Sequence, residues 1–190
     1  MRRNIKVLLI IILVIFLSPL NAEDRRTIPL DLYLIIDGSL ALQGFKNDAV
    51  TWINDQVVDR ILMDGDRITI WTAGDRAEVI YSETYSGQAG KKGITDKLAV
   101  LDTRGKAADF SGALREAASR VSQTARDRLA VTMLITASAE GLEPALSGSS
   151  QGLFRWFRSE KYEHWQVLIV ATEIGGKVQQ SAAAYMNSRR

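Results

Sequence analysis

Asp37, Ser39 and Asp109 are the side chains whose types and positions could do chemistry together. Asp37 and Ser39 directly follow an apolar run at residues 30–36, and Asp109 immediately precedes a segment with helical spacing of apolar residues at 110–124. Carboxylate and hydroxyl oxygens are the ligands that Mg²⁺ prefers. The same groups also accept backbone N–H groups in turns and at helix starts. These residues therefore allow either a cation site or a set of hydrogen-bonded loop ends.

The composition argues against other kinds of catalytic site. The chain has no Cys and a single histidine, His164, so a thiolate or multi-histidine metal site is excluded and no nucleophile–base pair is evident. His164 just precedes the last predicted strand, where we expect a solvated loop residue far from the site. The glycine-rich segment 87–93 lacks the spacing and the Ser or Thr of a phosphate-binding loop, and we interpret it as a mobile connection. The sequence thus predicts no enzyme.

Apolar runs alternate with segments of helical spacing along the chain. The continuous apolar runs are typical of a parallel sheet covered on both faces. The predicted fold is therefore α/β, with a doubly wound, mainly parallel central sheet and helices on both faces. One antiparallel edge strand is expected after a tight turn. Strands are predicted at residues 30–36, 67–72, 77–82 (the edge strand), 129–135 and 165–171, and helices at 45–63, 95–101, 110–124, 151–162 and 179–188.

The order and spacing of these elements resemble the von Willebrand factor type A family over about residues 30–186. The resemblance lies in three segments: LYLIIDGSLA at 32–41, DFSGALREA at 109–117 and VTMLITA at 131–137. It implies five side chains that hold Mg²⁺ or Mn²⁺ at the carboxyl ends of the strands, with a carboxylate of the partner completing the coordination. Here Asp37 and Ser39 match two of the five positions, whereas the other three fall on Ala41, Ala108 and Ala137.

The resemblance implies a protein-interaction module, and the three alanines imply a contact that is independent of divalent cations. Ligands of such sheets bind at the carboxyl ends of the strands. We expect the partner-binding loops there to include Asp37, Gly38, Ser39, Asp109, Ser138, Glu140 and Trp156. One alternative is a cation-dependent adhesion domain, with Mg²⁺ or Mn²⁺ on the reduced site Asp37, Ser39 and Asp109. A second alternative is a small-ligand carrier or an enzyme on the same fold.

The first 22 residues have the order of a secretory signal peptide. Arg2, Arg3 and Lys6 precede an apolar run at 7–17, and we expect cleavage after Ala22. The run is shorter than the roughly 20 apolar residues of a membrane span, so membrane attachment is expected only through this segment if it stays uncleaved.

Without this leader, the chain is nearly neutral. It has 24 Lys and Arg against 22 Asp and Glu; three of the basic residues and no acidic residue lie in the leader, which leaves a net charge of −1. A nucleic-acid partner requires a concentrated basic face and is not expected. We predict a short polar arm at 23–29 and one domain at 30–190, located in the periplasm or secreted, with a protein partner.

Overall fold

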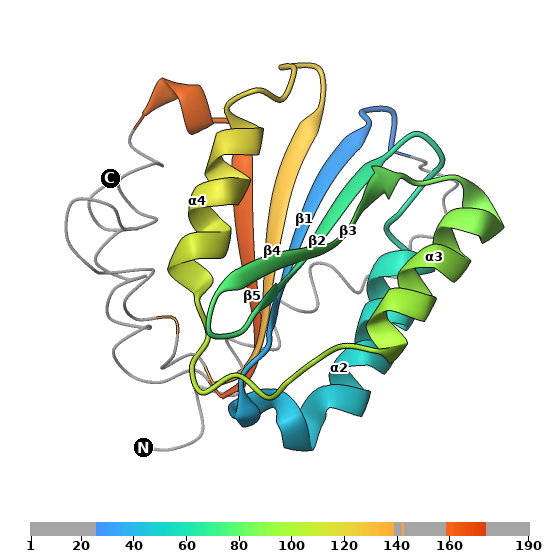
Figure 1. Ribbon diagram of the computed structural model, residues 1–190. Coiled ribbons are helices and arrows are strands. Elements are labelled where there is room, and N and C mark those ends of the chain that lie inside the picture. Colours follow the sequence, from blue (N-terminus) through green and yellow to red (C-terminus); the bar gives the residue numbers. More distant parts are fainter. Residues whose placement is uncertain (1–25, 139–141, 143–158, 174–190) are drawn as a thin grey trace, which may run out of the picture.

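The computed structural model describes residues 26–138, 142 and 159–173 (Figure 1). Within them, five strands form one sheet in the order β3-β2-β1-β4-β5. Helix α4 lies on one face of this sheet, and α2 and α3 lie on the other. The predicted α/β fold, with a mainly parallel sheet and helices on both faces, is confirmed.

The strands lie where the apolar runs predict them. β1 (Leu30–Asp37) is central and is buried at every residue. It pairs in parallel with β2 (Arg67–Ala73) and with β4 (Leu129–Ser138), and β4 pairs in parallel with β5 (Trp165–Glu173). β3 (Ala77–Thr84) runs antiparallel to β2 at the sheet edge, as predicted. The carboxyl ends of the four parallel strands therefore lie together at one end of the sheet, which we call its carboxyl edge.

The long helix predicted after β1 consists of three consecutive helices of different geometry. A 3-10 helix (Leu40–Phe45) leads into α2 (Lys46–Trp52), which continues as a π-helix (Ile53–Val58). The Asp59 amide donates to the carbonyl of Asn54, five residues earlier, at 3.0 Å, which is the π-helical pattern. The helix predicted at 45–63 is therefore confirmed over residues 46–58, with its second half π-helical, and residues 59–63 lie outside it. The segment packs against the sheet.

The segment 87–93, predicted as a mobile connection, is instead the first half of α3 (Gly87–Ala99). The second half of α3 matches the helix predicted from residue 95. A Cβ atom on Gly90 would lie only 3.0 Å from Cδ2 of Tyr85. Glycine therefore allows the helix to approach the tyrosine closely, and this packing outweighs the low helix propensity of glycine.

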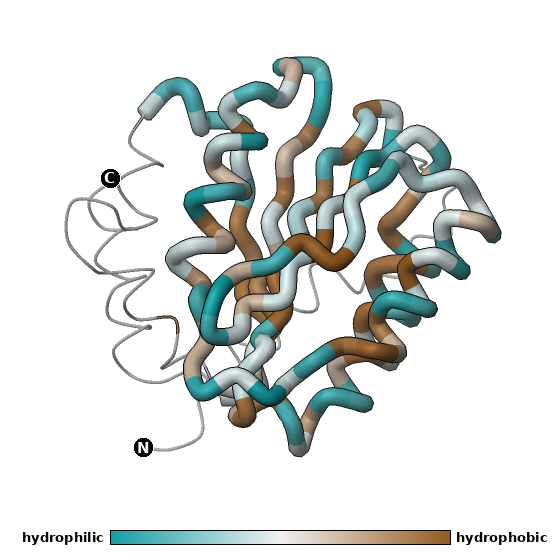
Figure 2. The backbone as a smooth tube through the Cα atoms, in the orientation of Figure 1, coloured by the Kyte–Doolittle hydropathy of each residue, from teal (hydrophilic) through white to brown (hydrophobic). Residues whose placement is uncertain are grey.

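Each face of the sheet has its own hydrophobic cluster. The cluster beneath α4 (Phe110–Val121) includes Trp71 of β2 and Leu114 of the helix. The cluster beneath α2 and α3 includes Ile70 of β2 and Ile94 of α3. Figure 2 shows hydrophobic residues gathered along the strands and the helices that cover them, with hydrophilic residues in the connecting loops. The central strands are thus held from both sides, which fixes where their ends lie.

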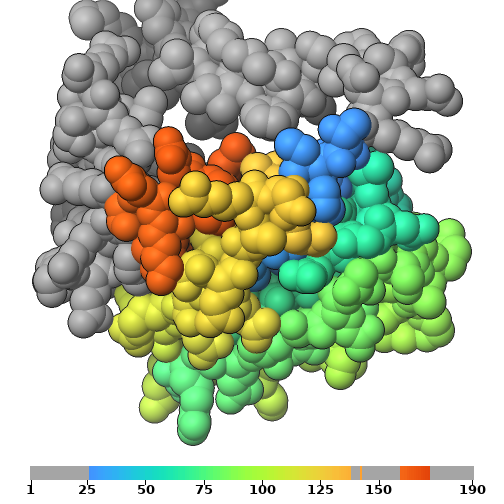
Figure 3. All heavy atoms as spheres, turned by 90° about the horizontal axis from the view of Figure 1, so that it is seen from above, coloured from blue at the N-terminus to red at the C-terminus, as the bar shows by residue number. Residues whose placement is uncertain are grey.

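Asp66 joins the loops at the amino ends of the strands. Its side chain accepts hydrogen bonds from the amides of Leu30 and Met63, both at 2.8 Å, and forms an ion pair with Arg26. The Arg26 guanidinium also donates to the carbonyl of Ile61 at 3.3 Å. Of the polar arm predicted at 23–29, Arg26 is half-buried and anchored, whereas residues 27–29 are exposed. In Figure 3, which looks onto this end, the segment before β1 lies between the segments that precede β2 and β4.

Several predicted segments fall outside the described residues. These are the leader at 1–22, the helix at 179–188 and most of the helix at 151–162, of which only Glu160–Tyr162 is described, as a 3-10 turn. Among the residues that the structure describes, no helix is long and apolar enough to cross a membrane.

Asp66→Ala should lower the free energy of unfolding by about 3 kcal/mol, because two backbone amides and the Arg26 guanidinium lose their acceptor. Asp96→Ala is the matched control. Asp96 is 61% exposed and forms an exposed ion pair with Lys92, so we expect a loss of at most about 0.5 kcal/mol. Urea denaturation followed by circular dichroism measures both values. Equal losses would contradict the anchoring role of Asp66.

Candidate functional site

The carboxylate of Asp37 connects the ends of the two central strands. Asp37 is the last residue of β1 and is 3% exposed. Its Oδ1 accepts the amide N–H of Ser39 at 2.8 Å, and its Oδ2 accepts the hydroxyl of Thr136 on β4, also at 2.8 Å. Thr136 is within reach because β1 and β4 are paired in parallel up to Ile36 and Ile135. Each oxygen of this buried carboxylate is therefore engaged with the chain itself.

Ser39 caps the 3-10 helix that follows β1. Its Oγ accepts the amide N–H of Ala41 at 3.3 Å, and the residue is 5% exposed. Ser is a preferred residue at such a helix start because its hydroxyl satisfies an amide that has no partner within the helix. The position of Ser39 thus has a structural explanation that needs no cation.

Asp109 has the same kind of role at α4. It is the N-cap of this helix, and its Oδ1 accepts the amide N–H of Gly112 at 2.8 Å. Its own amide donates to the carbonyl of Gly74, in the turn between β2 and β3, at 2.9 Å. Asp109 therefore fixes the start of α4 against that turn. A carboxylate at this place is also favoured by the helix dipole.

Two glycines, Gly38 and Gly105, let the loops at this edge pack backbone against backbone. The Gly38 amide donates to the carbonyl of Ala73 at 2.8 Å, and the Gly105 amide donates to the carbonyl of Gly38 at 2.9 Å. A Cβ atom on Gly38 would lie 2.5 Å from Oγ1 of Thr72 and 2.9 Å from the Gly74 nitrogen. These contacts leave no room for a side chain, so the edge is a rigid assembly of three loops.

Polar and charged side chains surround this assembly. The Asp75 carboxylate accepts the amide N–H of Lys106 at 2.7 Å. The Arg104 guanidinium donates to both oxygens of Asp102 at 2.8 Å, and this side-chain hydrogen bonding lowers the pKa of Asp102 to about 2. Leu40, between these charged groups and Ser39, is 53% exposed. We call this surface the loop rim; it comprises Leu40, Asp75, Arg76, Asp102, Arg104 and Lys106.

The side chains at this edge do not fit a magnesium or manganese ion. Such an ion takes about six oxygens in near-octahedral geometry. The oxygens of Asp37 and Ser39 already accept hydrogen bonds from the chain, and the three alanines supply no side-chain oxygen. In the part of the chain that the structure describes, no group of three or more His, Cys, Asp or Glu residues could hold a metal ion.

The structure brings together only part of the predicted site. Asp37, Gly38 and Ser39 lie at the edge as predicted, and Asp109 lies beside the same loops. Ser138 ends β4 and pairs with Glu173 of β5. Glu140 and Trp156 lie outside the described residues. His164 is at the opposite edge, as expected, but it is half-buried rather than solvated, and its Nε2 has no hydrogen-bond partner among the described residues.

The sequence did not predict the contacts of Thr136, Gly74 and Gly105. Thr136 was expected at a strand end, but its hydrogen bond to Asp37 depends on the register of β4 against β1. Gly74 and Gly105 lie in turns, where glycine is common, and only the packed loops reveal that a Cβ atom on Gly105 would lie 3.0 Å from the Gly38 carbonyl oxygen.

We compared the chain with known protein families, sequences and solved structures. No protein-family model matches the chain. An uncharacterized protein of Treponema pallidum (strain Nichols) is 21% identical over 168 residues, which cover 83% of this chain and 75% of that protein.

Solved structures share the architecture at low sequence identity. A manganese-loaded TRAP protein of Plasmodium vivax has a TM-score of 0.61 and 15% identity and covers 82% of this chain. Proximal thread matrix protein 1 of the mussel byssus has a TM-score of 0.57 and 12% identity over 81%. A von Willebrand factor type A protein of Catenulispora acidiphila has a TM-score of 0.55 and 14% identity over 83%.

The match spans 63%, 41% and 37% of those three chains, respectively. The protein thus has a von Willebrand factor type A-like fold. At these identities the likeness concerns the fold alone.

Gly38→Ala should destabilise the domain by about 2 kcal/mol or more, because the added methyl group overlaps Thr72 and the backbone of Gly74. Gly44→Ala serves as the control, since a Cβ atom there meets nothing within 4 Å. Chemical denaturation of both variants checks the prediction. If Gly38→Ala were as stable as Gly44→Ala, the three loops would not be packed as described.

Proposed function

We propose that this protein is an exported protein-interaction module that binds its partner through the loop rim without a divalent cation. The observation that carries the proposal is the Asp37 carboxylate, whose two oxygens are engaged by the Ser39 amide and the Thr136 hydroxyl. A signal-like leader at residues 1–22 supports export.

The number of available ligands argues against a cation at Asp37. A carboxylate can keep its hydrogen bonds while it binds a metal, so the contacts with Ser39 and Thr136 do not decide the question by themselves. Mg²⁺ takes about six oxygens, and the alanines at positions 41, 108 and 137 supply no side-chain oxygen. This shortage of ligands disfavours the reduced site made of Asp37, Ser39 and Asp109.

The loop rim can make direct contacts with a protein instead. Leu40 exposes an apolar side chain on a fixed backbone, because its amide donates to the carbonyl of Gly105 at 2.9 Å. Arg104 and Lys106 flank Gly105 in the sequence, and their side chains are exposed, as is that of Arg76. An apolar anchor within a polar periphery is the usual anatomy of a protein interface. Little conformational entropy is lost on binding when the anchor is already held in place.

Restoring the missing oxygens should create a cation dependence that the natural sequence lacks. The triple variant Ala41→Ser, Ala108→Thr, Ala137→Asp introduces a hydroxyl or carboxylate at each position that the family resemblance assigns to a ligand. We expect its melting temperature to rise on addition of Mg²⁺ or Mn²⁺, because a ligand that binds only the folded state stabilises it. The wild type should melt at the same temperature with Mg²⁺, with Mn²⁺ and with EDTA at matched ionic strength.

Asp37→Ala completes this comparison. It should destabilise the domain by about 2 kcal/mol, equally in EDTA and in Mg²⁺, because it removes a structural acceptor. A cation-dependent rise in melting temperature of the wild type that Asp37→Ala abolishes would refute cation-independent binding.

Leu40→Asp should abolish capture of the partner from the native envelope, because a charge replaces the apolar anchor. Ile28→Asp is the matched control, since Ile28 is also 53% exposed but precedes β1 at the opposite edge of the sheet. Affinity capture in EDTA, followed by mass spectrometry, measures both variants against the wild type. Two outcomes would contradict binding through the loop rim. In one, the two variants both fail to capture a protein that the wild type captures; in the other, the wild type itself captures no protein.

A further inference from the structure

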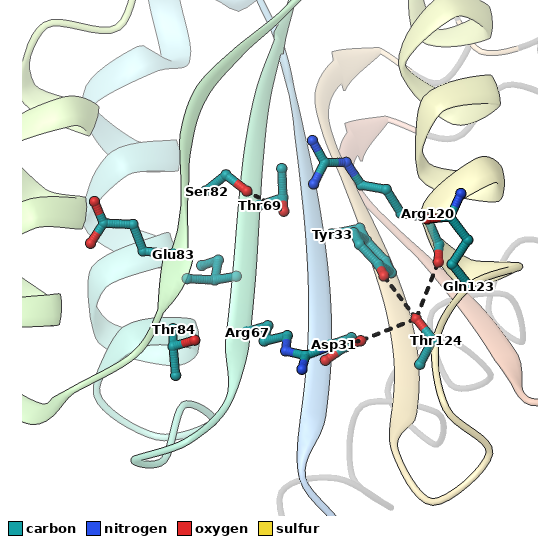
Figure 4. A pocket seen from close by; sticks show the side chains of 11 residues that line it. Asp31, Tyr33, Arg67, Thr69, Ser82, Glu83, Thr84, Arg120, Gln123 and Thr124 are labelled. Carbon is teal, nitrogen blue, oxygen red and sulfur yellow. Dashed lines mark hydrogen bonds and ion pairs between the residues drawn. The ribbon is translucent and has the colours of Figure 1, made fainter.

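A polar cleft of about 370 Å³ lies away from the loop rim, toward the amino ends of the strands. It opens between the last turn of α4 and the adjoining face of β1, β2 and β3 (Figure 4). Among its lining residues only Ile68 is apolar. Five of the others carry hydroxyl groups: Tyr33, Thr69, Ser82, Thr84 and Thr124. The composition of this surface suits a hydrophilic ligand rather than an apolar side chain.

Two guanidinium groups give the cleft its charge. Arg67 of β2 has a side chain that is 63% exposed, and Arg120 projects from α4 over the sheet. Arg120 lies over the ring of the buried Trp71, 5.4 Å from its centroid, which holds the guanidinium in place by a cation–π contact. Figure 4 shows Arg120 extending from α4 over β1 toward Thr69, whereas the guanidinium of Arg67 lies beside Asp31.

Two acidic residues, Asp31 and Glu83, also line the cleft, and Asp31 forms ion pairs with both Arg67 and Arg128. Asp31 is 3% exposed and is paired with Arg128, whose Nε donates to Oδ1 at 2.6 Å. Its other oxygen accepts the hydroxyl of Thr124 at 3.0 Å and lies 3.9 Å from Arg67. Figure 4 shows the carboxylate of Glu83 turned away from both arginines. Outside the cleft, Glu116 accepts the indole N–H of Trp71 at 2.8 Å.

The hydroxyl groups are held in position by the fold. Thr69 and Ser82 face each other on β2 and β3 with their oxygens 3.1 Å apart. The hydroxyls of Tyr33 and Thr124 are 3.0 Å apart. Burial raises the pKa of Tyr33, so its hydroxyl keeps its proton and stays neutral. Thr124 donates its proton within the chain, to Asp31 or to the Arg120 carbonyl, so the Tyr33 hydroxyl donates to Thr124. The guanidinium groups and the second hydroxyl proton of the Thr69–Ser82 pair remain to bind an oxyanion, and the charge-assisted hydrogen bonds are the stronger ones.

We propose that this cleft binds the phosphate or sulfate group of a small molecule, with Arg67 and Arg120 as its cationic contacts. A tetrahedral oxyanion accepts hydrogen bonds from several directions, which suits two guanidinium groups above a hydroxyl-lined floor. The volume is in the range of small-molecule sites and exceeds what one inorganic anion fills. This site is additional to the proposed protein interaction and does not depend on it.

Titration of the ¹⁵N-labelled protein with inorganic phosphate and, separately, with glucose 6-phosphate tests the proposal. Chloride at matched ionic strength is the reference. The indole signal of Trp71, assigned with Trp71→Phe, reports on the cleft because the ring lies beneath Arg120. Both Arg67→Gln and Arg120→Gln should raise the dissociation constant about tenfold, since each removes a charge-assisted contact. Arg115→Gln, an exposed position on the same helix, should leave it unchanged.

A saturable shift of the Trp71 signal that the two cleft variants weaken supports the site. Tighter binding of glucose 6-phosphate than of phosphate identifies a phosphorylated small molecule as the ligand, and equal binding identifies the free oxyanion. The absence of a saturable shift with either probe would overturn the proposal. A shift that is equally strong in Arg67→Gln, Arg120→Gln and Arg115→Gln would overturn it as well, because the anion would then bind elsewhere.

Discussion

The hydrogen bonds of Asp37 determine how the carboxyl edge of this sheet is built. Its carboxylate connects the loop after β1 to the end of β4, through Ser39 and Thr136. A carboxylate that is buried without such donors would be strongly destabilising. The burial of Asp37 therefore depends on its two donors. The loops around Gly38 can then pack at backbone distance.

This arrangement divides the molecule into two polar ends with different chemistry. At the carboxyl edge Arg104 is paired with Asp102, the side chains of Arg76 and Lys106 are exposed, and Leu40 exposes an apolar side chain. Toward the amino edge, Arg67 and Arg120 face a hydroxyl-lined cleft. The sheet between them is covered on both faces by α-helices, so each end has a fixed shape. A protein contact at one end and a small oxyanion at the other are therefore compatible.

The sequence predicted features that depend on local pattern and missed those that depend on register. β1 and the position of Asp37 followed from a continuous apolar run that ends in a turn. The sequence did not predict that residues 87–93 are helical, because their glycines suggested a loop. The glycines are instead explained by close packing against tyrosines: a Cβ atom on Gly93 would lie 3.2 Å from the Tyr81 ring. The pairing of Asp37 with Thr136 and the cleft likewise join residues far apart in sequence.

The central claim is that Asp37 is a structural acceptor and not a cation ligand. Paramagnetic line broadening by Mn²⁺ tests it most directly, because a manganese ion bound at Asp37 would lie next to the amides of Gly38 and Ser39. In a ¹H–¹⁵N spectrum of the wild-type protein, we predict that low concentrations of Mn²⁺ leave these two amide signals no more broadened than other buried amides. Selective, saturable broadening of both signals that excess Mg²⁺ reverses would contradict the account.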